Sequence, residues 1–117
     1  MSEQSSDPRI KEKDFLLALG LCARARNLVF GTEAVCEALR GGRETVYAVV
    51  EASNTSENTH KRILDKCHFY HVQRFQLTFS EADELGRALG KKGPIAAVGI
   101  TDKRMAEMVE KKRNAEM

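Results

Sequence analysis

The first stretch that could do chemistry runs over residues 24–42, R-A-R-N-L-V-F-G-T-E-A-V-C-E-A-L-R-G-G. A short β-prone run there ends at a glycine, and apolar residues then recur at helical spacing until a glycine pair that favours a helix stop. Thr32 is suited to cap the start of that helix. A helix start attracts anions, and Arg24 and Arg26 lie just before it. These residues therefore allow a phosphate site, although on their own they slightly favour an ordinary turn with solvated arginines.

A second basic stretch, G-K-K-G-P at residues 90–94, joins a predicted helix to a predicted strand. Lys91 and Lys92, with Arg87 about one helical turn before the loop, would form a compact basic patch. The two glycines let the backbone approach a ligand closely, and the two residues that follow the loop are small and apolar. This combination suits RNA better than a membrane. A plain connection between a helix and a strand is the alternative.

Cysteine and histidine side chains do not form a convincing metal site. Cys67 and His71 are four residues apart and could share an ion, but His60 precedes Cys67 by about 10 Å along a helix axis, which is too far for one tetrahedral site. Cys22, Cys36 and Cys67 include no C-x-x-C pair, and each falls on the apolar face of a predicted helix. We therefore predict three reduced, metal-free cysteines in the core.

Motifs of the common enzyme classes are missing from the sequence. Neither G-x-x-x-x-G-K nor G-x-G-x-x-G occurs, and no serine lies in a nucleophile elbow. Glu51 follows an apolar stretch and is the one acid placed where α/β proteins put functional sites. On the residues alone, a solvated strand end is the favoured interpretation of Glu51. We predict no catalytic residue, no metal and no cofactor.

The length of 117 residues predicts one domain with a real core. Hydrophobic residues make up 42% and charged residues 31%, which is the balance of an ordinary globular protein, and a net charge of +2 is too small to indicate a partner. The distribution of charge along the chain is more informative than the net charge, because residues 85–101 carry basic side chains and no acid. No apolar stretch is long enough to span a membrane, and the polar start is not a secretory signal. We expect a cytoplasmic protein without membrane contact.

Apolar spacing predicts helices that alternate with strands. Residues 1–12 should form a disordered polar tail, residues 13–113 one domain, and residues 114–117 a frayed end. Asp14, Ser80 and Asp102 should cap the first, fourth and fifth helices, the fourth ending near residue 89. The remaining predicted elements are a strand over 28–30, a helix over 32–40, a strand over 45–52, a helix over 57–70, a strand over 72–77 near a sheet edge, and a strand over 95–101.

This alternation favours the α/β class, with a sheet between two helix layers. The stretches 45–52 and 95–101 are apolar on both faces, which is typical of central strands covered on both sides. We therefore expect buried side chains at Val46, Ala48, Val50, Ala97 and Val98.

Four segments resemble one known family. They are L-G-L-C-A-R-A-R-N-L-V-F-G-T-E-A-V at 19–35, A-V-V-E-A-S at 48–53, N-T-H-K-R-I-L-D-K-C at 58–67 and E-L-G-R-A-L-G-K at 84–91. They are similar to the ribosomal protein L-seven-Ae / L-thirty-e superfamily, in particular to its small bacterial YlxQ-type members. The resemblance runs in order from about residue 15 to about residue 109. It implies a three-layer α/β/α sandwich around a four-stranded mixed sheet, and binding of kink-turn RNA, a sharply bent element with tandem sheared G·A pairs.

The resemblance also implies where RNA binds. In that family the turn before the second helix and the first residues of that helix enter the RNA groove, and the loop before the last strand covers the extruded bases. Together with the flanking basic residues, the predicted RNA-binding residues are Arg24, Arg26, Asn27, Gly31, Thr32, Glu33, Ala34, Glu37, Arg40, Glu51, Arg87, Gly90, Lys91, Lys92, Gly93, Pro94, Ile95 and Ala96.

This chain departs from the family pattern at the start of the second helix. Kink-turn binders typically carry a polar pair and then a lysine there, whereas this chain has Glu33, Ala34 and Glu37. Two acids near a phosphate are unfavourable, and alanine cannot bond a guanine edge. Asn27 stands where a lysine is usual, with Arg26 beside it.

We therefore predict a non-enzymatic, monomeric protein that binds structured RNA, either a kink-turn or ribosomal RNA, with ribosomal or RNA-processing proteins as candidate partners. The alternative hypothesis is a protein-interaction module on the same fold, with weak or lost RNA binding.

Overall fold

A four-stranded mixed sheet forms the middle layer of the protein. The computed structural model describes residues 7–42 and 44–114. The strand order is β1-β4-β2-β3, in which β4 is antiparallel to both of its neighbours and β2 is parallel to the edge strand β3. The strands are β1 (Leu28–Phe30), β2 (Ala48–Glu51), β3 (Gln73–Gln76) and β4 (Ala97–Ile100).

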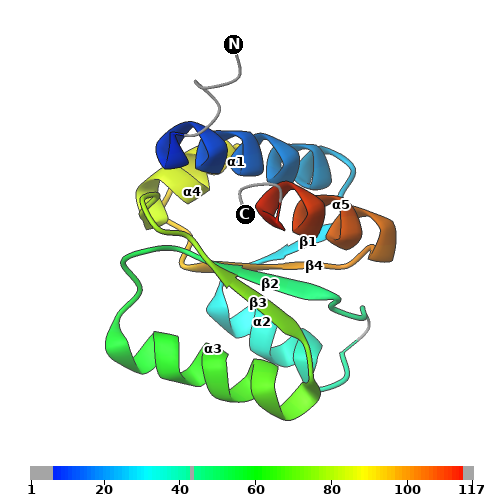
Figure 1. The fold of residues 1–117 in the computed structure, drawn as a ribbon. Coiled ribbons are helices and arrows are strands. Elements are labelled where there is room, and N and C mark those ends of the chain that lie inside the picture. Colours follow the sequence, from blue (N-terminus) through cyan, green and yellow to red (C-terminus); the bar gives the residue numbers. More distant parts are fainter. Residues whose placement is uncertain (1–6, 43, 115–117) are drawn as a thin grey trace.

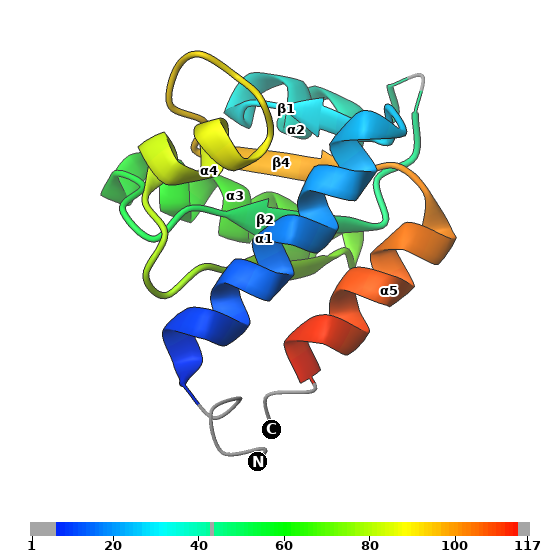
Figure 2. The same cartoon turned by 90° about the horizontal axis from the view of Figure 1, so that it is seen from above.

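Helices cover both faces of this sheet (Figure 1). One face carries α1 (Pro8–Arg24), α4 (Ala82–Ala88) and α5 (Lys103–Asn114), and the other carries α2 (Thr32–Leu39) and α3 (Glu57–Tyr70). Seen from above, α1 lies between α5 and α4 (Figure 2). The predicted three-layer α/β/α sandwich with a four-stranded mixed sheet is confirmed.

The core lies in two halves because the side chains of a strand alternate between the two faces of the sheet. In the central strand β2, Ala48 and Val50 pack toward α1, α4 and α5, whereas Val49 packs toward α2 and α3. The neighbouring strand β4 is also buried along its whole length. Burial is confirmed for all the residues named from the sequence: Val46, Ala48, Val50, Ala97 and Val98.

The first helix begins at Pro8, well before the predicted start at Asp14. Proline suits the first position of a helix, where its missing N–H costs no hydrogen bond. Asp7 caps this end, because its carboxylate accepts the backbone N–H of Arg9 at 2.9 Å. The prediction of a disordered tail is therefore wrong for residues 8–12. Its residues 1–6, and residues 115–117 of the predicted frayed end, lie outside the described residues.

Glu12 shows why these residues belong to the domain. Its carboxylate is buried and accepts three backbone N–H groups, from Thr78 at 2.7 Å, Phe79 at 2.8 Å and Ser80 at 2.7 Å. Charge-assisted bonds of this kind are roughly twice as strong as neutral ones. The first helix therefore holds the connection between β3 and α4 in place.

The start of α4 also differs from the prediction. Ser80 donates its N–H to Glu12 and does not cap the helix. Glu81 is the capping residue, and it forms a reciprocal capping box with Glu84. Asp102 behaves as predicted, since its carboxylate accepts the N–H of Met105 at 2.9 Å at the start of α5.

The three cysteines pack inside the domain, as their positions on apolar faces predicted. Burial raises the pKa of the Cys22 thiol and that of the Cys67 thiol to about 11, so both thiols are neutral near pH 7. Across residues 7–42 and 44–114, no group of three His, Cys, Asp or Glu side chains is arranged to hold a metal ion. No helix in that part of the chain is long and apolar enough to cross a membrane.

Candidate nucleic-acid interface

The structure brings the two basic stretches of the sequence together at one end of the sheet. The N–H of Gly31, in the turn before α2, donates to the carbonyl of Ala97 at 2.8 Å, and Ala97 directly follows the loop between α4 and β4. Across the same junction, the Lys91 ammonium lies 4.1 Å from the centre of the Phe30 ring, a cation–π contact. The turn and the loop therefore form one continuous surface.

The start of α2 in this surface is open. Gly31 has a φ of 96°, a left-handed conformation that favours glycine, and its carbonyl accepts the N–H of Val35 at 2.9 Å. Gly31 is therefore the capping residue, and Thr32, predicted as the cap, is the first residue of the helix. Among the described residues, no side chain accepts a hydrogen bond at this cap. The first N–H groups of α2 consequently remain available to an anion.

One of the two acids of α2, Glu33, is paired with a cation that the sequence did not indicate. The Glu33 carboxylate accepts two hydrogen bonds from the Arg62 guanidinium of α3, at 2.7 and 2.9 Å. These bonds, and the charge of Arg62, hold the pKa of Glu33 below its ordinary value. Glu37 lies 4.0 Å from Arg40 in a loose, exposed pair that contributes little. Arg62 was missed because it lies 29 residues from Glu33, and no local pattern marks it.

The loop over residues 90–94 is exposed and held tightly by α4. The N–H of Lys91 donates to the Gly86 carbonyl at 2.8 Å, and the N–H of Ile95 donates to the Ala82 carbonyl at 3.0 Å. A Cβ atom on Gly86 would lie only 2.1 Å from the carbonyl oxygen of Gly93. Glycine at position 86 therefore positions this loop, which gives a physical reason for the glycine inside E-L-G-R-A-L-G.

Ile95 does not belong to the exposed surface. Its side chain is 9% exposed and packs in the core against the α1 layer. Ala96 is half-buried, and its carbonyl accepts the N–H of Ala52 at 2.8 Å. The loop presents Gly90, Lys91, Lys92, Gly93 and Pro94 to solvent.

Glu51 is not a solvated strand end, and that interpretation is wrong. Its side chain is fully buried at the end of β2, and its carboxylate accepts hydrogen bonds from the Thr55 hydroxyl and, at 2.8 Å, from the Arg74 guanidinium. His60 Nδ1 lies 2.7 Å from the same carboxylate. With its oxygens occupied inside the fold, Glu51 supports the end of the sheet and cannot contact RNA directly.

Two further predicted residues also lie apart from the joined surface. Asn27 sits at the opposite end of β1 from Gly31, and its side-chain amide donates to the Met105 sulfur of α5 at 3.2 Å. Arg40 directly follows α2 and caps its C-terminal end, away from the open start of that helix. We exclude both from the candidate interface.

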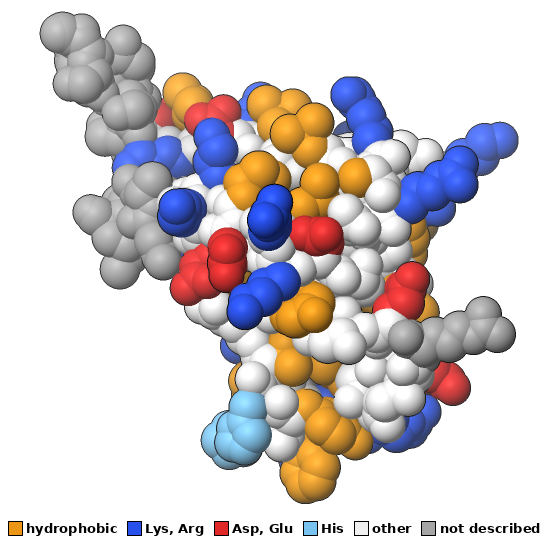
Figure 3. Space-filling model, turned by 90° about the vertical axis from the view of Figure 1, so that its right-hand side faces the viewer, with side chains coloured by type: hydrophobic (Ala, Val, Ile, Leu, Met, Phe, Trp, Pro, Cys, Tyr) orange, Lys and Arg blue, Asp and Glu red, His pale blue; other side chains and the backbone are white. Residues whose placement is uncertain are grey.

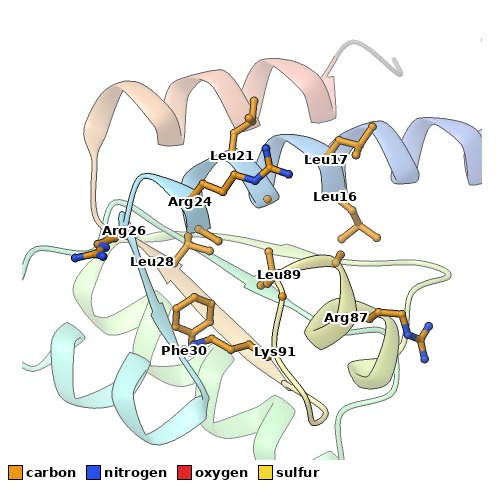
Figure 4. Close-up of a pocket in the computed structure, with 14 residues that line it drawn as sticks. Leu16, Leu17, Leu21, Arg24, Arg26, Leu28, Phe30, Arg87, Leu89 and Lys91 are labelled. Atoms are coloured by element: carbon orange, nitrogen blue, oxygen red, sulfur yellow. The ribbon is translucent and has the colours of Figure 1, made fainter.

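Four of the predicted cations line one groove beside this surface. The groove encloses about 790 Å³ between α1, β1 and the loop after α4. In Figure 4, Lys91 lies over Phe30, while Arg26 and Arg87 point outward on opposite sides. Arg24 lies along α1 at the edge of the groove. The groove therefore gathers cations from two stretches of the chain, residues 24–26 and residues 87–91.

The family model for the ribosomal protein L7Ae/L30e/S12e/Gadd45 family matches residues 13–110. The chain belongs to this family. The protein named "RNA-binding protein YlxQ" from Bacillus subtilis (strain 168) is 36% identical over 88 residues, which is 75% of this chain and 83% of that protein. The protein of the same name from Enterococcus faecium is 36% identical over 96 residues, which is 79% of this chain and 87% of that protein.

Solved structures show the same architecture. A Bacillus halodurans protein described as having unknown function superposes with a TM-score of 0.76 at 32% identity, covering 86% of this chain and 96% of that one. The Giardia lamblia 15.5kD RNA binding protein has a TM-score of 0.70 at 15% identity, covering 90% and 86%, and shows the fold alone. The family and its relatives confirm the predicted resemblance and the prediction that this chain is not an enzyme.

Proposed function

We propose that this protein binds structured RNA across the surface shared by the Gly31 turn and the loop over residues 90–94, with a kink-turn as the preferred element. The observation that carries the proposal is the hydrogen bond from Gly31 to Ala97, since it joins an open helix start to an exposed lysine pair. The names of the two YlxQ relatives support RNA as the ligand class.

Electrostatics favour the RNA backbone at this surface. The free N–H groups of α2 and the positive end of its dipole attract one phosphate. Lys91 and Lys92 supply positive charge beside it, and Lys91 is held over the Phe30 ring next to Gly31. Because Arg62 pairs with Glu33, the acid nearest the open helix start is largely neutralised. Phosphate contacts of this kind supply a large share of the affinity of proteins for nucleic acids.

The preference for a bent element follows from the two-part shape of the surface together with the family resemblance. A sharply bent RNA can touch the helix start and the glycine-containing loop at the same time, whereas a straight duplex presents only its regular backbone. Ribosomal RNA that contains such a bend fits the same proposal, with one protein chain per bend in the cytoplasm.

The test is a salt titration of binding to a kink-turn RNA and to a straight duplex of matched length. The wild-type protein should prefer the kink-turn. Changing Lys91→Ala and Lys92→Ala together should weaken binding and lower the salt slope by about two units, one for each phosphate that a lysine no longer neutralises. The matched control changes Lys111→Ala and Lys112→Ala, an exposed lysine pair on α5, and should leave kink-turn binding close to wild type. Equal affinity for the two RNAs, together with equal effects of both lysine pairs, would contradict the proposal.

A further inference from the structure

An apolar stripe runs along the outer side of α1. Leu17 is 70% exposed and Leu21 is 52% exposed, and their four-residue spacing places them side by side on the helix. Ile10, which is 46% exposed, lies two turns before Leu17 on the same side of α1, with the exposed Asp14 between them. In Figure 3, hydrophobic side chains gather over the upper helical layer, with basic and some acidic side chains around them. Neighbouring apolar side chains that stay exposed make this side of α1 a candidate interaction surface.

The stripe borders the groove between α1 and the loop after α4. Leu17 and Leu21 project from its upper edge, while Leu16 and Leu89 point into it (Figure 4). The groove is therefore apolar along its floor and along one edge. An amphipathic helix could place two apolar side chains, one turn apart, against these leucines.

The charge around the groove is of one sign. Its lining includes Arg24, Arg26, Arg87 and Lys91, and none of the described residues that line it is acidic. The matching ligand is therefore both apolar and acidic. Complementary charge of this kind steers association and fixes the orientation of the partner.

We propose that this groove docks an acidic, amphipathic helix of a protein partner, alongside the RNA surface. A single-stranded RNA fits it less well, because nucleobases bind by stacking on aromatic rings. Phe30 is the only aromatic residue among the described lining residues, and the Lys91 ammonium covers its ring. The leucines, in contrast, match aliphatic side chains of a polypeptide. This partner site goes beyond the RNA binding proposed above and does not depend on it.

The probe is a synthetic helical peptide with two leucines one turn apart and glutamates on both flanks. Its control is the same peptide with lysines in place of the glutamates. Binding to the full-length protein is followed by amide chemical shifts. The acidic peptide should shift the amides of Leu17, Gly20, Leu21 and Leu89, and the basic peptide should not.

Two surface variants make the test specific. Leu17→Ser with Leu21→Ser should weaken acidic-peptide binding by about tenfold or more, because both apolar anchors are removed. Leu64→Ser with Phe69→Ser, an exposed apolar pair on α3, should leave it unchanged. RNA binding should be unaffected by either pair.

Three results would overturn the proposal: equal binding of the acidic and basic peptides, no shift of groove amides with the acidic peptide, or groove shifts caused by a single-stranded oligouridylate and not by the peptide. Because Lys91 lines the groove as well as the RNA surface, Lys91→Ala with Lys92→Ala should weaken binding of both ligands, whereas the leucine pair should weaken binding of the peptide alone and so separates the two proposals. The two proposals therefore fail independently.

Discussion

Substituting Gly86→Ala should disturb RNA binding, although Gly86 itself is buried in α4 and lies outside the proposed RNA surface. The added Cβ would lie 2.1 Å from the Gly93 carbonyl oxygen and 3.2 Å from its carbonyl carbon. Ordinary contacts between such atoms are above about 3 Å, so the loop backbone must retreat by roughly 1 Å. Because the obstacle is backbone, no side-chain rotation relieves it.

Two opposing terms decide the effect on stability. Alanine in place of glycine inside a helix stabilises by about 1 kcal/mol. Overpacking against a fixed backbone costs about 1–3 kcal/mol. The loop is held by the hydrogen bonds from Lys91 to Gly86 and from Ile95 to Ala82, so the cost of overpacking should exceed the gain from replacing a helical glycine. We expect a net loss of about 1 kcal/mol in the free energy of unfolding, and about tenfold weaker kink-turn binding from the displaced lysines.

The assay combines urea unfolding with fluorescence anisotropy on a labelled kink-turn RNA. Gly20→Ala is the matched control, because a Cβ at that helical position would lie 3.4 Å from the Ala88 carbonyl oxygen, an ordinary contact. That control should gain up to about 1 kcal/mol and keep its RNA affinity. A Gly86→Ala protein that is more stable than wild type and binds RNA equally well would refute the reasoning.

Three further predictions address single contacts. Glu12→Ala should lower the free energy of unfolding by about 2–4 kcal/mol, as measured by urea, because it leaves three backbone N–H groups without their acceptor; a loss below about 0.5 kcal/mol would contradict this role. Glu37→Lys should tighten kink-turn binding more than duplex binding in anisotropy, because it replaces an opposing charge near the α2 start; unchanged affinity would place RNA elsewhere. Arg62→Ala should return the pKa of Glu33 toward 4.5 in a carboxyl NMR titration. In the wild-type protein, the pair stabilises the folded state at pH values above 4.5, and this stabilisation disappears as the pH falls through the lowered pKa of Glu33. If Glu33 titrates identically in the wild type and in Arg62→Ala, the pair does not form in solution.

Local patterns were sufficient to predict most of the fold. The helix over residues 57–70 begins and ends as predicted, because Ser56 accepts the N–H of Thr59 at 3.2 Å and His71 turns into the left-handed region with a φ of 58°. The central strands were recognisable because they are apolar on both faces. Each of these signals depends on residues that are close together in the chain, so it can be recognised from the sequence without the fold.

The errors have a different physical cause, namely pairing over long separations in the chain. Glu12 looked like part of a polar tail, but the N–H groups that it accepts begin at Thr78, 66 residues away. Glu51 looked solvated, but Arg74 neutralises it from 23 residues away. A charged side chain looks the same in a sequence whether it is solvated or buried with a partner, and only the fold decides between the two.

For the candidate interface, the sequence indicated two segments that the structure brings together, but it did not show how they meet. The Gly31 turn and the lysine loop were each visible as local patterns, and their contact through Ala97 required the sheet order. Gly86 is part of the E-L-G-R-A-L-G motif, but the sequence does not show why a glycine is needed there, which is the close approach of the Gly93 carbonyl.

The most direct test of the account is amide chemical-shift mapping of the wild-type protein during titration with a kink-turn RNA. The account predicts that the largest changes fall in two segments distant in sequence, residues 31–34 at the start of α2 and residues 90–93 of the loop, with little change on α3 beyond Arg62. Changes confined to α3 or α5, or no change at either of the two segments, would contradict RNA binding at this surface.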